Sequence, residues 1–160
     1  MMEQLDDVDI RILQLLQKNC RLTNKEIGEK LHKTASPINS RIKRLEDDGF
    51  IKGYIAILDQ DKIERGLMAL THVQLLNHSE ESLNHFEAEI CKFEEVLECY
   101  HMSGKYDFVL RIAVRDLKVY HDFLMNRLFK LVPNGQIQST FVMKEAKREL
   151  GYPLNLDKAK

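Results

Sequence analysis

The chain has 160 residues, of which 44% are hydrophobic and 31% charged, and its formal net charge is −1 at neutral pH. A chain of this size can bury one or two small cores. It holds no run of the roughly 18 apolar residues needed to cross a membrane. The acidic start and three widely spaced cysteines suggest neither a signal peptide nor a disulfide framework, so we expect a cytoplasmic protein with reduced thiols.

Two short helices are predicted near the N-terminus. The first spans residues 5–18, where Asp6 or Asp7 can act as the N-cap. The second spans residues 24–31 and is preceded by Thr23, with Glu26 three residues later at the spacing of a capping box. Such hydrogen bonds satisfy the free N–H groups of a first helical turn, so both helix starts are predicted by local signals.

A third helix is predicted from Ala35, and it completes a helix-turn-helix domain over residues 1–50. The hydroxyl of Thr34 is expected to cap it, and Pro37 falls in its first turn, where a missing N–H does no damage. Gly49 is expected to end it. Its buried stripe has helical spacing and consists of Ile38, Ile42 and Leu45.

The opposite side of this third helix carries the predicted DNA contacts. At roughly 100° per residue, the side chains expected to reach DNA are those of Thr34, Ser36, Asn39, Ser40, Lys43 and Arg44, with Arg41 on the flank. Such side chains bind phosphates or base edges in the major groove. Residues 18–44 hold eight basic and two acidic side chains, a local excess of six positive charges. We therefore predict double-stranded DNA as the partner.

Residues 51–66 are predicted to link two domains. The segment FIKGYIAIL at residues 50–58 is rich in β-branched and aromatic residues, which favour an extended wing or hinge strand. The polar segment at residues 59–66 follows, and the domain boundary is expected there.

Residues 67–146 alternate between strand and helix patterns. Strands are predicted at residues 67–76, 96–103, 106–114 and 136–144, and helices are predicted after the caps Ser79 and Asp116. Gly104 and Lys105 are expected to form a two-residue type II′ turn. The β-α-β-β-α-β order predicts a ferredoxin-like antiparallel sheet with both helices on one face, and the whole chain is therefore of the α+β class.

The other face of this sheet is predicted to be uncovered. Val109, Ala113 and Val142 are expected on it, and uncovered apolar sheet surface usually finds a partner. We therefore predict a homodimer formed across this face. For the charged tail at residues 147–160, disorder and an interface arm are both open.

Motifs over nearly the whole chain resemble the Lrp/AsnC (feast/famine) transcriptional regulators. The matching segments are LDDVDIRIL, RLTNKEIGEKL, SRIKRLEDDGFIKGYIAILD, VLECYHMSGKYDFVLRIAV and IQSTFVMKE. The resemblance implies a winged helix-turn-helix, a linker strand and a ligand-sensing domain that forms dimers and often a ring of four dimers. It also implies an amino-acid effector near Gly104, Lys105, Tyr106, Asp107, Gln138, Ser139 and Thr140.

The residue types at that position fit an amino-acid ligand. Asp107 can pair with an ammonium group, while the N–H groups near Gly104 and the hydroxyl of Thr140 can donate to a carboxylate. The alternative is that Gly104 is only a turn residue and Asp107 only a solvated strand end.

Two other classes of function are open at this point. One is a small-molecule enzyme, because ferredoxin-like domains host such chemistry, although the sequence has no HExxH pair or phosphate-binding glycine loop. His72 and His101 lie on predicted strands and could meet at a metal ion, but half-buried histidines are the favoured interpretation. The other is an architectural DNA-binding protein without an effector. We expect neither catalysis nor a cofactor.

Overall fold

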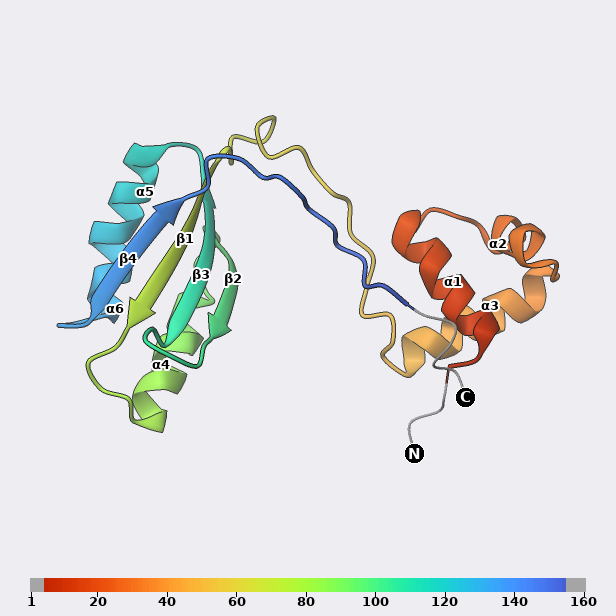
Figure 1. The fold of residues 1–160 in the computed structure, drawn as a ribbon, viewed down its shortest axis with the longest axis horizontal. Coiled ribbons are helices and arrows are strands. Elements are labelled where there is room, and N and C mark those ends of the chain that lie inside the picture. The colour runs from red at the N-terminus through yellow and green to blue at the C-terminus, as the bar shows by residue number, and fades with distance from the viewer. Residues whose placement is uncertain (1–4, 155–160) are drawn as a thin grey trace. The chain divides into compact units, whose positions relative to one another are not determined.

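The computed structural model describes residues 5–154, and the chain divides into two compact units (Figure 1). One unit comprises the residues up to 56 together with those from 147 onward, and the other comprises residues 57–146. The tail therefore groups with the N-terminal helices. None of the described helices is long and apolar enough to cross a membrane.

The first unit is built on three helices: α1 (Asp7–Lys18), α2 (Asn24–Leu31) and α3 (Ala35–Asp47). Asp6 and Asp9 form a capping box at the start of α1, and Thr23 and Glu26 form another at the start of α2. Both predicted caps are thereby confirmed. The helices enclose a small core of buried side chains, made of Ile12, Leu16, Ile27, Ile38 and Leu45.

The two ends of α3 differ in how far they follow the prediction. Thr34 is the N-cap residue by its backbone geometry, but its side chain caps none of the N–H groups of α3, a helix that the structure describes completely. A cap usually binds the second or third N–H of a helix, and the third residue here is Pro37, which has none. At the other end the prediction is confirmed: Gly49 has a φ of +77° and its N–H donates to the carbonyl of Glu46 at 3.0 Å.

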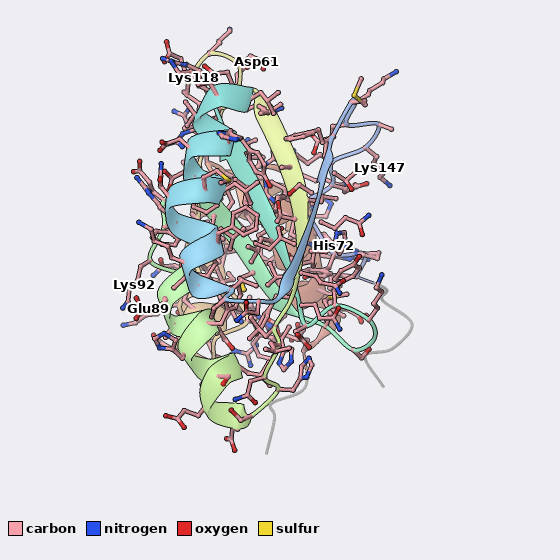
Figure 2. The ribbon with its side chains drawn as sticks, turned by 90° about the vertical axis from the view of Figure 1, so that its left-hand side faces the viewer. Asp61, His72, Glu89, Lys92, Lys118 and Lys147 are labelled. Atoms are coloured by element: carbon pink, nitrogen blue, oxygen red, sulfur yellow. The ribbon has the colours of Figure 1, made fainter. Side chains whose placement is uncertain are left out.

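The second unit is a four-stranded antiparallel sheet with helices on one face (Figures 1 and 2). The strands lie in the order β2-β3-β1-β4, which confirms the ferredoxin-like prediction. In chain order the elements are β1 (Leu67–Gln74), α4 (Glu80–Ile90), β2 (Val96–His101), β3 (Phe108–Val114), α5 (Leu117–Phe123), the π-helical segment η1 (Leu124–Leu128), α6 (Phe129–Leu131) and β4 (Gln136–Phe141). Ser79 and Asp116 cap α4 and α5 as predicted.

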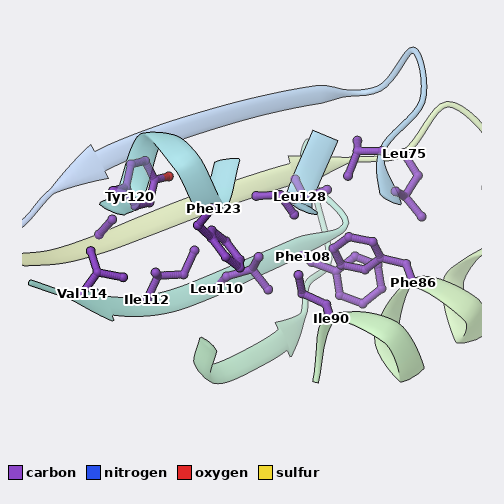
Figure 3. Close-up of a cluster of buried hydrophobic side chains, with 13 residues drawn as sticks. Leu75, Phe86, Ile90, Phe108, Leu110, Ile112, Val114, Tyr120, Phe123 and Leu128 are labelled. Atoms are coloured by element: carbon purple, nitrogen blue, oxygen red, sulfur yellow. The ribbon is translucent and has the colours of Figure 1, made fainter. Parts of the chain in front are cut away.

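The core of the sheet unit lies between the sheet and its helices (Figure 3). On β3, alternate side chains point into it, and all four are fully buried: Phe108, Leu110, Ile112 and Val114. The Phe86 ring packs on the Phe108 ring with 4.7 Å between centroids. Because successive side chains of a strand point to opposite faces, this alternation also fixes which residues lie on the uncovered face.

One polar network crosses this core. The hydroxyls of Thr71 and Tyr120 are 2.7 Å apart, and those of Tyr120 and Ser139 are 2.5 Å apart. Thr71 is fully buried, so these hydrogen bonds satisfy groups that would otherwise be costly to remove from water. They join β1, α5 and β4 on the helix side of the sheet.

The β2–β3 connection keeps the register that a two-residue turn at Gly104 and Lys105 requires, because His101 pairs with Phe108 and the N–H of Met102 donates to the carbonyl of Asp107 at 2.7 Å. The regular strands are shorter than predicted, since β2 ends at His101 rather than at residue 103 and β3 begins at Phe108 rather than at residue 106. Gly104 has a φ of +123°, a backbone conformation that other residues rarely adopt. The loop therefore spans residues 102–107.

The segments that flank the sheet unit contain no regular structure in the described residues. Residues 51–58 form no strand in the single chain described here, so the predicted hinge strand is not present in it. An extended segment becomes a strand only when another strand satisfies its backbone groups. The tail binds α1 instead: the side chain of Gln17 donates to the carbonyl of Tyr152 at 3.1 Å and accepts from its N–H at 2.6 Å. Gln14 likewise donates to the carbonyl of Leu154 at 2.8 Å.

Candidate functional site

The solvent-facing side of α3 carries most of the predicted DNA-contacting side chains. Five of them are exposed: Thr34, Ser36, Asn39, Ser40 and Lys43. The side chain of Asn24, at the start of α2, donates to the Asn39 amide oxygen at 2.9 Å and so orients it. The Ser40 hydroxyl donates to the carbonyl of Ser36 at 3.3 Å. This face offers amide and hydroxyl groups and one cation, the set that base edges and phosphates bind.

Arg41 and Arg44 point elsewhere, toward the start of α1. Arg41 Nη1 contacts Asp6 Oδ2 at 2.6 Å and Asp9 Oδ1 at 2.7 Å. Arg44 Nη2 contacts Asp9 Oδ2 at 2.5 Å. The prediction that Arg44 points outward with Lys43 is therefore wrong, because the carboxylates at the start of α1 draw the arginine to the flank of α3.

The carboxylate at the centre of this group is buried. The Asp9 side chain is 1% exposed, whereas those of Arg41 and Arg44 are 31% and 37% exposed. Hydrogen bonds from Arg41 to Asp9 and to Asp6 raise the pKa of the guanidinium. For Asp6, partial burial acts to raise its pKa, but the N–H of Asp9 and the Arg41 side chain outweigh that and hold the pKa below its ordinary value. Both shifts favour the charged forms of Asp6 and Arg41.

In the sheet unit, Asp107 anchors the β2–β3 loop to the loop after β1. Its Oδ2 accepts from the N–H of Leu75 at 2.7 Å and lies 3.2 Å from His78 Nε2. The Asp107 side chain is 14% exposed. It is thus neither a solvated strand end nor an unoccupied carboxylate, because the protein already supplies two of its partners.

Tyr106 lies beside Asp107 and connects the loop to β4. Its hydroxyl donates to the side chain of Gln138, and its ring lies 5.2 Å from the His72 ring, centroid to centroid. The ammonium of Lys105 lies 5.0 Å from the centre of the Tyr106 ring. The structure therefore brings the loop and β4 together at one end of the uncovered face, as the predicted effector site requires.

The three predicted effector residues of β4 divide between the two faces of the sheet. Gln138 and Thr140 are exposed on the uncovered face. Ser139 points to the helix side, where its hydroxyl contacts Tyr120. Ser139 can therefore reach a ligand on the uncovered face only through its backbone.

His72 and His101 do not meet. His72 is on the uncovered face, since its neighbours Thr71 and Val73 are fully buried in the core, and Figure 2 shows it on the side away from the helices. His101 stacks on the core residue Phe108 at 4.9 Å between ring centroids. The sheet separates the two rings, so the possible metal site between them is excluded. Among the described residues, no group of three or more metal-binding side chains could hold a metal ion.

A cavity of about 360 Å³ lies on the sheet unit between the loop after β1 and the end of α6. His85 and Lys130 border it together with apolar groups such as Leu75 and Pro133. No predicted effector residue lines it. It is therefore separate from the site formed by the β2–β3 loop and β4.

Two neighbours of the predicted sites were not identified from the sequence. Asp9 is visible there as part of a helix-start signal, but nothing in the spacing indicates that it binds arginines 32 and 35 residues away. His72 reaches Tyr106 only because β1 lies beside both β3 and β4. The position of His72 on the uncovered face could have been predicted from the sequence, because polar and apolar residues alternate along β1.

Models of two known domains match the chain. The Lrp/AsnC ligand binding domain matches residues 68–152, and the winged helix-turn-helix DNA-binding domain matches residues 5–52. The first match covers the strands and helices of the sheet unit and extends into the tail, and the second covers the three helices of the other unit.

Relatives of known function and solved structures match over nearly the full chain. The chain is 36% identical to the DNA-binding transcriptional activator DecR of Escherichia coli, over 94% of this chain and 99% of that protein. It is 32% identical to the leucine-responsive regulatory protein of Salmonella typhimurium, over 91% and 89%. A transcriptional regulator from Neisseria meningitidis, solved in complex with L-Met, is 36% identical with a TM-score of 0.88, over 94% and 97%.

Proposed function

Because the chain belongs to the Lrp/AsnC family of DNA-binding transcriptional regulators, we propose that α3 enters the major groove and reads DNA through its exposed face. The residues assigned to this role are Thr34, Ser36, Asn39, Ser40 and Lys43. The observation that carries the proposal is that these polar side chains are all exposed, while the apolar stripe of α3 is buried against α1 and α2. Arg41 and Arg44 are assigned to holding α3 rather than to reading bases.

Lys43 provides the sharpest test of this face. Replacing Lys43 with Ala should weaken binding to any duplex and make the salt dependence of log affinity shallower by about 0.9, the value for one phosphate contact. Lys118→Ala removes a cation that is also exposed, but from the sheet unit, and is the matched control. Gel-shift titrations at several salt concentrations measure both. An unchanged slope for Lys43→Ala would refute its contact with DNA.

We also propose that the protein is a homodimer formed across the uncovered sheet face. Leu70 and Tyr100 are exposed on this face, and Val109 pairs with Tyr100 in the strand register. An apolar patch of this kind is self-complementary across a twofold axis. Two copies of α3 would then read two half-sites of a roughly palindromic site, about one helical turn apart or a small multiple of it.

Charge placed on this face should separate the dimer. Leu70→Glu should give a monomer in sedimentation equilibrium, because two carboxylates would be buried opposite each other. Leu117→Glu puts the same charge on an exposed residue of α5, on the helix side of the sheet, and should keep the dimer.

We propose further that four dimers form an octamer, which light scattering of the parent protein would measure directly. A dimeric mass at all concentrations contradicts the octamer.

For the sensing unit, we propose an amino-acid effector at the site formed by Gly104, Lys105, Tyr106, Asp107, Gln138, Thr140 and the backbone of Ser139. Two findings support it: the loop and β4 are joined through Tyr106 and Gln138, and the related Neisseria meningitidis regulator was solved with L-Met. The Thr140 hydroxyl and the loop N–H groups suit a carboxylate. Leu75 and His78 both contact Oδ2 of Asp107, so we assign its other carboxylate oxygen to an ammonium group.

A thermal-shift screen of the twenty amino acids tests the effector, because a ligand that binds only the folded state raises the melting temperature. Thr140→Val should abolish the shift, while Gln136→Ala, on the same strand and face, should keep it. No shift with any amino acid would favour an architectural role without an effector.

We assign no catalytic step to the chain, and we place its action in the cytoplasm with the DNA that it binds.

A further inference from the structure

The sheet unit has a second concave site, apart from the proposed effector site. The cavity of about 360 Å³ lies between the loop after β1 and the end of α6, and none of the predicted effector residues borders it. Ligand sites in proteins commonly have volumes of about 300–1,000 Å³ and mostly apolar walls with a few polar groups. This cavity therefore has the size for a small organic molecule rather than for a single ion.

The walls of the cavity are held by the core of the sheet unit. Leu75 is 7% exposed and belongs to the buried cluster shown in Figure 3. The turn that carries Pro133 and Asn134 packs closely on the end of β1, since a Cβ on Gly135 would lie 2.3 Å from the carbonyl oxygen of Gln74. Glycine permits this close approach of two backbones. The cavity is therefore formed without a ligand, which reduces the ordering that binding would cost.

The polar groups that border the cavity offer hydrogen-bond donors and positive charge. Lys130 is exposed and makes no ion pair with the residues that the structure describes. The side-chain oxygen of Asn77 already accepts from a backbone N–H two residues later at 2.9 Å, so its amide NH₂ is the group left for a ligand. His85 can donate through its ring, and Glu89, one turn further along α4, is paired with Lys92 at 2.5 Å. Among the described residues that border the cavity, none is acidic.

The rest of the cavity wall is mostly apolar. It is formed by Leu75, Leu76, Leu131 and Pro133. Leu76 is 68% exposed, so an apolar chain that lies on it would remove apolar surface of both partners from water. The cavity thus combines an apolar wall with a group of donors, the arrangement that suits a ligand with one anionic end and one apolar end.

We propose that this cavity binds a small monocarboxylate with an apolar chain, whose carboxylate contacts Lys130 and Asn77 and whose chain lies on the leucines. A free amino acid fits this cavity poorly, because its ammonium group would lose water without meeting an anion. At the proposed effector site, by contrast, Asp107 is assigned to an ammonium group. The two sites share no residue, so this inference does not depend on the amino-acid effector.

Calorimetric titration of the full chain with hexanoate tests the charge of the ligand. We expect saturable binding with a dissociation constant of about 1 mM or tighter, as a ligand of this size can reach. Hexylamine, which has the same chain and the opposite charge, should give no saturable heat. Lys130→Met should weaken hexanoate binding about tenfold or more by removing a charged hydrogen-bond donor. Lys118→Met, at an exposed lysine outside the cavity, should leave it unchanged. Equal affinity of Lys130→Met and the parent, or no saturable binding by the parent, would overturn the inference.

Peptide-level hydrogen exchange tests where hexanoate binds. At saturation, hexanoate should protect the peptides that cover residues 75–82 and 130–134, which border the cavity. Protection confined to residues 102–107 and 136–141 would place hexanoate at the proposed effector site and would overturn the inference. A thermal-shift screen that finds no amino-acid ligand, while hexanoate still protects the cavity, would overturn the effector proposal alone.

Discussion

The helical unit and the sheet unit reach stability by different routes. Among the residues that the structure describes, five side chains form the core of the helical unit, all of them aliphatic, whereas thirteen form the core of the sheet unit, including three phenylalanines and a tyrosine. The helical unit adds to its small core the two capping boxes at the starts of α1 and α2 and the ion pairs of Asp9 with Arg41 and Arg44. A small unit cannot bury enough apolar area to be stable by packing alone.

This difference matches the two tasks. The helical unit has to present a polar face to DNA, so its charged groups must be held in place near the surface. The sheet unit has to hold the loop at residues 102–107 and β4 in place for the proposed effector site. Substitutions in cores, turns and caps should therefore have separable effects on the two units.

The largest effect is expected in the aromatic core of the sheet unit. Phe108→Ala removes a fully buried ring that packs against Phe86, and should lower the free energy of unfolding by about 3–5 kcal/mol. Denaturant unfolding gives the value, and peptide-level hydrogen exchange assigns it to the sheet unit. If α1–α3 lost protection to the same extent, the two units would unfold as one and the comparison would fail.

A smaller effect is expected in the turn between α2 and α3. A Cβ on Gly28 would lie 2.5 Å from the carbonyl oxygen of Lys33, a backbone atom that cannot move alone. Gly28→Ala should cost about 1–3 kcal/mol through this overlap, which exceeds the gain of about 1 kcal/mol from the better helix propensity of alanine.

Gly53 is the control for this turn. A Cβ there meets nothing within 4 Å, so Gly53→Ala should be neutral or slightly stabilising. Thermal unfolding of the helical unit, followed by circular dichroism, compares the two variants. Equal melting temperatures would mean that the turn can open without cost, and that Gly28 does not fix the angle between α2 and α3.

The two threonine caps sharpen the comparison within the helical unit. Thr23→Ala removes a side-chain cap that accepts from the N–H of Glu26, and should cost about 1 kcal/mol. Thr34→Ala removes no such hydrogen bond and should leave stability nearly unchanged while it weakens DNA binding. Melting temperatures and gel shifts on the same two variants separate these roles. A larger loss of stability for Thr34→Ala would reverse the assignment.

The sequence predicted the features that depend on nearby residues. The caps at Thr23, Ser79 and Asp116 and the helix end at Gly49 are set by hydrogen bonds or backbone angles within a few residues, and the structure contains all four. The strand order followed from element order, because few sheet topologies satisfy short connections with helices on one face. The residues of the uncovered face could be predicted as well, because successive side chains of a strand point to opposite faces of the sheet.

Features that depend on distant contacts could not be predicted. Arg44 donates to Asp9, which lies 35 residues earlier in the chain, while the helical periodicity gives only the angle of Arg44 around α3. The shape of the β2–β3 loop is set by Asp107, which binds the backbone of Leu75 across the sheet. The strand predicted at residues 50–58 has β propensity, but propensity makes no strand without a partner to pair with.

The smallest effect is expected from acid, and it should appear first in the capping boxes of the helical unit. The Thr23 backbone N–H and hydroxyl donate to Glu26 and hold its pKa below 4.5, and the pKa of Asp6 is held below 3.8. Carboxyls whose pKa is lowered by folding stabilise the fold above their unfolded pKa, and this contribution is lost as the pH falls through the folded pKa. The melting temperature of the helical unit should therefore be constant above about pH 5 and fall below pH 4.5. Glu26→Gln should remove part of that fall, whereas Glu29→Gln, on the same helix and without a resolved capping partner, should not. A melting temperature that fell equally in both variants would show that the capping carboxylate does not couple the stability of this unit to pH.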